Sequence, residues 1–194
     1  MGRRIAEAAE EQRLLPETQM GNRKERSTEL AVRMVTEIVR TAWREGAIAL
    51  LAQLDIRRAF DTVNHIRLLD TLREMGFQPW VVRWVRSFLA ERTACLRFDE
   101  EDSGWLPVPA GVPQGSPLSP ILFILYTASL YRALARYAGL ASVGFSDDLN
   151  LVAVGHTAEQ TRDILEHAWG VCERWARTRG MQFAPQKTEL MHFT

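Results

Sequence analysis

The stretch Gly144 to Gly155, GFSDDLNLVAVG, decides the fold, because it places two adjacent aspartates inside a run that is otherwise suited to burial. On either side of Asp147 and Asp148, the segments SVGFS and LNLVAV are rich in strand-forming residues. Two strands separated by two residues predict a tight β-hairpin with both aspartates at its turn. Residues 137–161 contain no Lys or Arg, so another segment or a cation must supply the counter-charge.

The composition is that of an ordinary globular chain with one compact domain, since 46% of the 194 residues are hydrophobic and 25% are charged. The formal net charge is zero, so any contact with nucleic acid requires a local basic surface. Cys95 and Cys172 are isolated, which predicts neither a disulfide framework nor a zinc site. We expect a reducing compartment, nuclear or cytoplasmic, with no signal peptide and no membrane contact, because MGRRIAEAAEEQ has no apolar core and ILFILY is too short to span a bilayer.

Helices and a buried strand are predicted upstream of the hairpin. Apolar residues recur at helical spacing between Leu30 and Ala42, and Gly46 is placed to end that helix. The run AIALLAQLD, which ends at Asp55, is typical of a buried strand. Asn64 can cap a second helix. The apolar face of this second helix is expected to comprise Ile66, Leu69, Leu72 and Met75.

The remaining elements complete an α+β order. A third helix is expected after Pro79, a hairpin from TACLRF and WLPVPA, and a long apolar helix from Pro120 to about Tyr137, capped by Ser116 or Ser119. An amphipathic helix follows the aspartate hairpin, and MQFAPQKTELMHF is interpreted as a second hairpin that carries Lys187. The order predicts an antiparallel sheet with helices on one face and the other face open for a ligand.

Asp55 changes the interpretation of the paired aspartates. Taken alone, Asp147 and Asp148 are explained at least as well by a solvated turn. Asp55, however, ends a buried strand, and if that strand lies beside the hairpin then three carboxylates converge on one sheet edge. Mg²⁺ binds through one or two carboxylates per ion together with substrate phosphates. A pair of such ions stabilises the attacking and leaving oxygens in nucleotidyl transfer.

Two further segments bear on the site. Phe60 follows Asp55 closely enough to wall a pocket for the sugar of a nucleotide, although a lone Phe is more often a core residue. Asp61 is interpreted as a residue that caps or braces the following turn. The segment AGVPQGSPLSPILF surrounds Gln114 with glycines and prolines, which gives a stiff loop whose backbone can approach a ligand. Its alternative role is only that of a helix entry.

Together these motifs resemble the reverse transcriptases of LINE-like, non-LTR retrotransposons, most closely those of filamentous fungi. The resemblance runs from about Leu15 to Thr194. It rests on QMGNRKERST, LDIRRAFDTVNHIRLLDTLREMGF, WVRSFLAERT, AGVPQGSPLSPILF, GFSDDLNLVAVG and FAPQKTELMHF, in that order. The fold that it implies is a right-hand polymerase palm with fingers and thumb largely missing. The implied segments are a helical segment 1–16, a remnant of the connection between fingers and palm at 17–46, and the palm at 47–194.

The resemblance also implies roles for individual residues. Asp55, Asp147 and Asp148 would be the catalytic aspartates and would hold two Mg²⁺ ions, for which Mn²⁺ can substitute. Phe60 would be the sugar gate, and Gln114 and Gly115 would touch the incoming nucleotide and template. Lys187 would approach the triphosphate. The hairpin motif here is FSDD, where the family more often has Ala or Val in place of Ser146.

The implied reaction is RNA-templated DNA synthesis, in which a DNA primer 3′-OH attacks the α-phosphate of a dNTP. The basic residues Arg23 and Arg26 are candidates for contact with the substrate strands, although a solvated connector is the usual role of such a run. An alternative function is that of an inactive or domesticated palm module that binds nucleic acid or protein. A nucleotide cyclase is a third class, which AGVPQGSPLSP does not fit. The oligomeric state is not indicated by the sequence.

Overall fold

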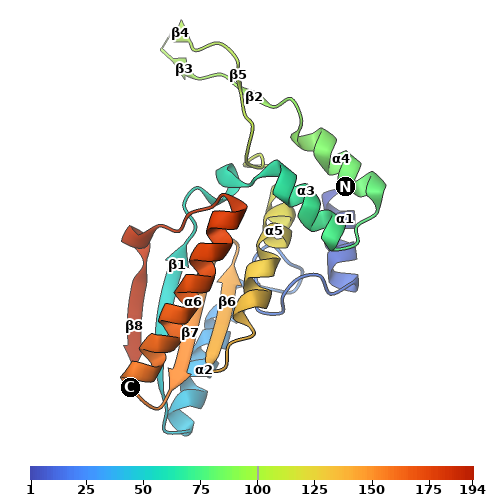
Figure 1. Ribbon diagram of the computed structural model, residues 1–194. Helices are drawn as coiled ribbons and strands as arrows, with labels where there is room; N and C mark the ends of the chain where they lie inside the picture. Colours follow the sequence, from blue (N-terminus) through green and yellow to red (C-terminus); the bar gives the residue numbers. More distant parts are fainter. Residues whose placement is uncertain (100) are drawn as a thin grey trace.

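The computed structural model describes residues 1–99 and 101–194, and it is built around a four-stranded antiparallel sheet in the order β6-β7-β1-β8. The strands are β1 (Ile48–Asp55), β6 (Leu140–Phe145), β7 (Asp148–Gly155) and β8 (Glu189–Phe193). Figure 1 shows β1 and β7 side by side in the middle of the sheet, with β8 and β6 at its edges. The predicted α+β class with an antiparallel sheet is confirmed.

The register of the two central strands places Asp55 directly opposite Asp148. In the hairpin, Phe145 pairs with Asp148, so the two loop residues are Ser146 and Asp147. The predicted hairpin therefore exists, but its loop lies one residue earlier than expected. Asp148 already belongs to β7, because Phe145 and Asp55 give it strand partners on both sides.

Two long helices cover one face of the sheet. Helix α5 (Ser119–Leu134) is buried along nearly its whole length, and α6 (Ala158–Arg179) lies beside it (Figure 1). Alternate residues of the central strands, including Leu54, Leu149 and Leu151, contribute to the same core as these helices. The Thr157 side chain caps α6 by accepting a hydrogen bond from the Gln160 amide.

Helix α2 (Thr28–Arg44) forms a layer on the second face, so the prediction that this face stays open for a ligand was wrong for the part that α2 covers. Val39 and Ala42 pack against Ala49, Leu51 and Val152 of the sheet. Nearer to Asp55 the same face carries polar side chains, and Gln53 donates a hydrogen bond to Asn150 across the strands. The second face is thus covered at one end and open at the end where the aspartates lie.

The remaining helices flank α5 and share its core. They are α1 (Gly2–Glu11), α3 (His65–Glu74) and α4 (Pro79–Leu89), with a short 3-10 helix η1 (Ala59–Thr62) before α3. Asn64 caps α3 as predicted, by accepting a hydrogen bond from the Arg67 amide. The predicted apolar face was wrong at Ile66, which is 71% exposed, because Leu68 takes its place in the core.

The segments at 93–107 and 181–193 differ in how well they follow expectation. The first is a hairpin that extends away from the body (Figure 1), with the short ladders β2 (Thr93–Ala94) to β5 (Leu106–Pro107) and β3 (Arg97–Phe98) to β4 (Glu101–Asp102).

The second segment, residues 181–193, was predicted to be a hairpin and is not. Phe183 makes only an isolated bridge to Ile56, the short helix η2 (Pro185–Lys187) follows, and β8 pairs with β1.

None of the helices in the described part of the chain is both long enough and apolar enough to cross a bilayer.

We expect Gly144→Ala to lower the free energy of unfolding by about 2–3 kcal/mol, because overpacking a filled core has a cost of this size. A Cβ at this strand position would overlap the hydroxyl of the buried Tyr131. The matched control is Gly170→Ala in α6, where a Cβ meets only the flexible end of Arg174. This control should be neutral or more stable by up to about 1 kcal/mol. Urea denaturation of both variants makes the comparison, and equal stability of the two would contradict this packing.

Candidate active site

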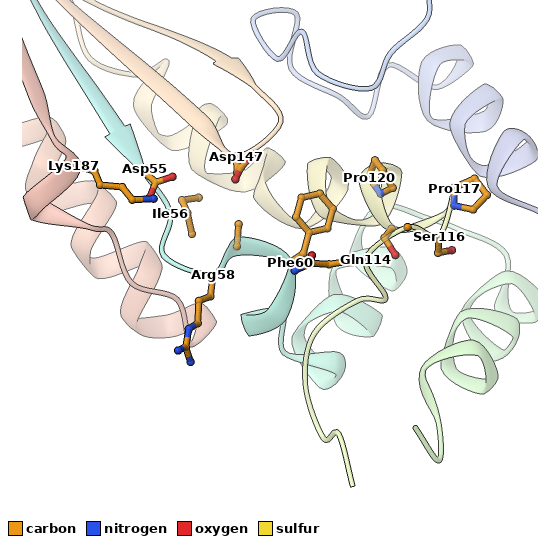
Figure 2. Close-up of a pocket in the computed structure, with 13 residues that line it drawn as sticks. Asp55, Ile56, Arg58, Phe60, Gln114, Ser116, Pro117, Pro120, Asp147 and Lys187 are labelled. Carbon is orange, nitrogen blue, oxygen red and sulfur yellow. The ribbon is translucent and has the colours of Figure 1, made fainter. Parts of the chain in front are cut away.

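A cavity of about 780 Å³ lies at the ends of the two central strands. Its walls come from four separate parts of the chain: the end of β1 with η1, the loop before α5, the hairpin loop and η2. The residues that line it include Asp55, Phe60, Gln114, Gly115, Ser116, Asp147 and Lys187. Figure 2 shows the carboxylates at one end of the cavity and the loop before α5 at the other. Six of the nine predicted site residues therefore line this cavity, and Asp55 and Asp147 are among them.

The three aspartates lie together at one edge of the sheet, but they do not all face the same space. Asp55 and Asp147 line the cavity. Asp148 lines a second hollow, on the open part of the α2 face, and Asp55 lies at the boundary of both. The pairing of β1 with β7 thus places the three aspartates at the same end of the sheet.

Lys187 supplies a counter-charge for this cluster. Its Nζ lies 2.9 Å from Oδ2 of Asp55, and Figure 2 shows the two side chains pointing toward one another. The contact is an ion pair. The Oδ2 atom is buried, and it accepts no hydrogen bond from the described residues. The family resemblance implied that Lys187 approaches the triphosphate of a substrate. In the structure its ammonium group contacts the carboxylate instead.

The negative charges of the three aspartates lie close enough to affect one another. Partial burial raises the pKa of Asp148, and the carboxylates of Asp147 and Asp55 raise it further, while Lys187 acts in the opposite direction. The close contact with the Asp55 carboxylate and its negative charge raise the pKa of Lys187, which therefore stays cationic. The folded chain holds these carboxylates close together at an electrostatic cost.

The donor set suits a hard cation. All three aspartates offer carboxylate oxygens, and the buried Oδ2 of Asp55 accepts no hydrogen bond from the described residues, although Lys187 contacts it as an ion pair. Among residues 1–99 and 101–194, no three acidic, His or Cys side chains converge on a single point. Mg²⁺ commonly takes only one or two protein carboxylates and completes its shell with water and substrate phosphates. The residues present fit such a shared site better than an all-protein cage.

Phe60 and Gln114 are held side by side by pairing between the η1 segment and the loop before α5. The Val112 amide donates to the Phe60 carbonyl at 2.8 Å, and the Gln114 side chain donates to Oδ1 of Asp61 at 2.9 Å. The half-buried ring of Phe60 stacks on Phe123 with centroids 4.9 Å apart, so it is both a core residue and a wall of the cavity. Asp61 therefore braces Gln114 across the loop. The sequence predicted only that Asp61 would cap or brace the turn that follows it.

The comparisons with known proteins agree with this geometry. The family model described as Reverse transcriptase (RNA-dependent DNA polymerase) matches residues 2–193. The chain belongs to the reverse transcriptase family. The match includes α1, so the resemblance starts earlier than the predicted Leu15.

The curated relatives of this reverse transcriptase domain are retrotransposon proteins. It is 30% identical over 197 residues to a probable RNA-directed DNA polymerase from transposon BS of Drosophila melanogaster, covering 95% of this chain and 21% of the relative. The X-element protein of the same species is 31% identical and is covered to 21%, with 98% of this chain aligned. The chain thus spans about a fifth of the length of these relatives. The resemblance to non-LTR retrotransposon enzymes is confirmed.

Solved structures support the fold of the reverse transcriptase domain. A Candida tropicalis telomerase in complex with a fragment of telomeric RNA has a TM-score of 0.75 at 12% identity, covering 98% of this chain and 33% of that one. A Candida albicans telomerase complex has a TM-score of 0.69 at 14% identity, covering 98% and 34%. At such identities the likeness shows the shared polymerase-type fold.

The loop before α5 and the basic connector differ from expectation. Neither Ser116 nor Ser119 caps α5 through its side chain, because Ser119 donates to the Pro113 carbonyl and Ser116 accepts from the Leu118 amide within the loop. Arg23 and Arg26 do not line the cavity. Their guanidinium groups are instead engaged in ion pairs within the N-terminal part of the chain.

The contacts of the two arginines assign them a structural role. Arg23 contacts both carboxylate oxygens of Glu10 at 2.6 and 2.7 Å and also donates to two backbone carbonyls, with only 4% of its side chain exposed. Arg26 pairs with Glu17 at 2.6 Å. The Arg23 pair ties this segment to α1, whereas Arg26 and its partner Glu17 both lie in the segment between α1 and α2. Both arginines lie outside the cavity with their charges partnered, and their contact with the substrate strands stays a prediction.

We expect Asp148→Asn to raise the free energy of unfolding at about pH 7 by up to about 1 kcal/mol, a size limited by solvent screening of a largely exposed group. The pKa of Asp148 is raised in the fold, so its stabilising contribution is complete below its unfolded pKa and is lost as the pH rises through the folded pKa.

The advantage of Asp148→Asn should therefore disappear at about pH 3.5, where the carboxyl of the parent is protonated. Urea denaturation at both pH values measures it. Asp163→Asn on α6, next to Arg162, is the control and should show no such gain at neutral pH. A parent that is more stable than Asp148→Asn at neutral pH would contradict the crowded-charge description.

Proposed function

We propose that this domain is the catalytic palm of an RNA-directed DNA polymerase, which transfers a nucleotidyl group from a dNTP to the 3′-OH of a DNA primer on an RNA template. The observation that carries the proposal is the single cavity that joins two of the three aspartates to Phe60 and Gln114. Pyrophosphate is the leaving group. The family membership supports the type of reaction, and the retrotransposon relatives support a template made of RNA.

Asp55, Asp147 and Asp148 would hold two Mg²⁺ ions, for which Mn²⁺ can substitute. When bound, such ions stabilise the charge on the attacking and leaving oxygens of an in-line displacement. The aspartates contribute fixed negative charge at the strand ends, where the backbone ladder keeps Asp55 and Asp148 opposed. Lys187 is the resident cation of Asp55, and its flexible, 64% exposed side chain can turn toward the phosphates of an entering dNTP.

The opposite end of the cavity would bind the sugar and base. Phe60 presents its ring to the cavity while Phe123 supports it from behind, which suits a rigid steric block against a ribose 2′-hydroxyl. Gln114 and Gly115 lie on the loop that lines the same wall. With Asp61 accepting from its amide, Gln114 is held ready to contact the incoming nucleotide and the template.

The first test is primer extension on a homopolymer RNA template with Mg²⁺, using the variants Asp147→Asn and Asp55→Asn. A neutral amide is a poor substitute for a metal-binding carboxylate, so incorporation should fall by at least about 100-fold, a loss typical of removing a key electrostatic group. Asp61→Asn is the control and should be milder, because Asp61 contacts Gln114 and lies outside the carboxylate cluster.

Activity of Asp147→Asn within a few fold of the parent would contradict the metal assignment. The assay should be run on the 194-residue chain and on a version extended by its flanking sequence. An inactive or domesticated palm module is the alternative function. It would show the same background in the parent and in Asp147→Asn in both lengths, together with retained binding of nucleic acid or protein.

The second test concerns the sugar. Phe60→Val should let ribonucleotides be incorporated with an efficiency roughly tenfold or more above that of the parent relative to dNTPs, because the discrimination rests on steric exclusion of one hydroxyl. The ratio of kcat/KM for a dNTP and the matching rNTP is the measurement. Phe123→Leu removes the ring that supports Phe60 and serves as a packing control. A Phe60→Val enzyme that rejects ribonucleotides as strongly as the parent would leave Phe60 as a core residue only.

A further inference from the structure

We propose that Gln19 is a positioning residue that sets the geometry of the Ser146-Asp147 loop and thereby aims Asp147 into the cavity. The side chain of Gln19 is completely buried. Its Nε2 donates to the Ser146 carbonyl and to the Tyr131 hydroxyl, both at 3.2 Å, and its Oε1 accepts from the Gly21 amide at 2.8 Å. The amide is buried, and both its nitrogen and its oxygen are hydrogen-bonded. Removing it would leave buried polar groups without these partners, which is costly in free energy.

The backbone on either side of Gln19 pairs with the same hairpin. The Met20 amide donates to the Gly144 carbonyl at 2.7 Å, and the Gly144 amide donates to the Thr18 carbonyl at 2.9 Å. A Cβ at Gly21 would overlap the backbone of Ser146, so the two segments are in close contact there. Residues 18–22, the loop clamp, therefore grip residues 144–146 by main chain and side chain together.

The backbone conformation of the hairpin loop explains why contacts from the loop clamp are needed. Ser146 has a φ of +58°, in the left-handed region that is unfavourable for residues with a side chain. It is the residue directly before Asp147, so its backbone angles determine where the Asp147 side chain points. Gln19 captures the carbonyl of Ser146 in this conformation.

Tyr131 anchors the clamp to the core. It lies on α5, is 4% exposed, and its hydroxyl occupies the space left by the absent side chain of Gly144. Burial raises the pKa of Tyr131, so its hydroxyl stays neutral and can accept the Gln19 hydrogen bond. The loop clamp thus connects the loop before Asp147 to the most buried helix of the domain.

The expected effect of Gln19 on catalysis rests on the proposed function. The first test measures hydrogen exchange and does not depend on that function. In the 194-residue chain, amide hydrogen exchange of Gln19→Ala should be faster than in the parent by about fivefold or more at residues 145–149, as loss of a net hydrogen bond gives for local opening. Exchange in the middle of α5 and β1 should be unchanged. Gln160→Ala, which removes a side-chain contact to the His156 amide beyond the opposite end of β7, is the matched control.

Rescue separates positioning from general stability. Ser146→Gly adopts a positive φ readily, so adding it to Gln19→Ala should restore most of the slow exchange at residues 145–149. In primer extension, Gln19→Ala should lower kcat by roughly tenfold to a hundredfold, as small misplacements of catalytic groups do, with the KM for dNTP within about threefold of the parent. It should also raise the Mg²⁺ concentration for half-maximal rate, and the added Ser146→Gly should reverse both changes.

The outcomes are distinct. Unchanged exchange at residues 145–149 in Gln19→Ala overturns the inference, whatever the activity of the parent. Faster exchange throughout the chain, with no rescue by Ser146→Gly, also overturns it and leaves Gln19 as a general stabilising residue. A parent without primer extension defeats the proposed function of the chain but leaves the exchange test of Gln19 in force.

Discussion

The antiparallel pairing of β1 with β7 is the constraint on which the site depends. Because the ladder runs in register from Ile48 opposite Gly155 to Asp55 opposite Asp148, two carboxylates must meet at its end. A shift by one residue would turn every side chain of a strand to the opposite face and would bury polar groups in the core. The apolar residues that pack on α5 and α6 therefore fix the position of the aspartates as firmly as any contact of the aspartates themselves.

Three other segments complete the cavity from distant parts of the chain. The loop before α5 brings Gln114 to Phe60 through its pairing with η1, and η2 brings Lys187 to Asp55. Residues 18–22 hold the hairpin loop from the side away from β1. Each segment is fixed by backbone hydrogen bonds, which tolerate sequence change better than side-chain contacts do. This is consistent with a fold shared with telomerases at 12% identity.

The fold holds the three aspartates close together although their negative charges repel one another. Burial and like charges raise the pKa of Asp148, and the exposed Lys187 offsets only part of the charge. Such a concentration of strain and charge is common at functional sites, because the remainder of the fold supplies the stability that the site gives up. Here that reserve is the long buried α5, together with the sheet face that it covers.

The sequence by itself determined the α+β class, most helices and strands, and the existence of the aspartate hairpin, because hydrophobic periodicity and capping residues such as Asn64 are local signals. It also named Asp55, Phe60 and Gln114 as neighbours through family resemblance. Only the tertiary structure decided that the hairpin loop is Ser146-Asp147, that Lys187 pairs with Asp55, that Arg23 is buried against Glu10, and that Gln19 grips the loop. These features depend on strand register and on contacts between segments far apart in the chain, for which neither spacing nor composition carries a signal.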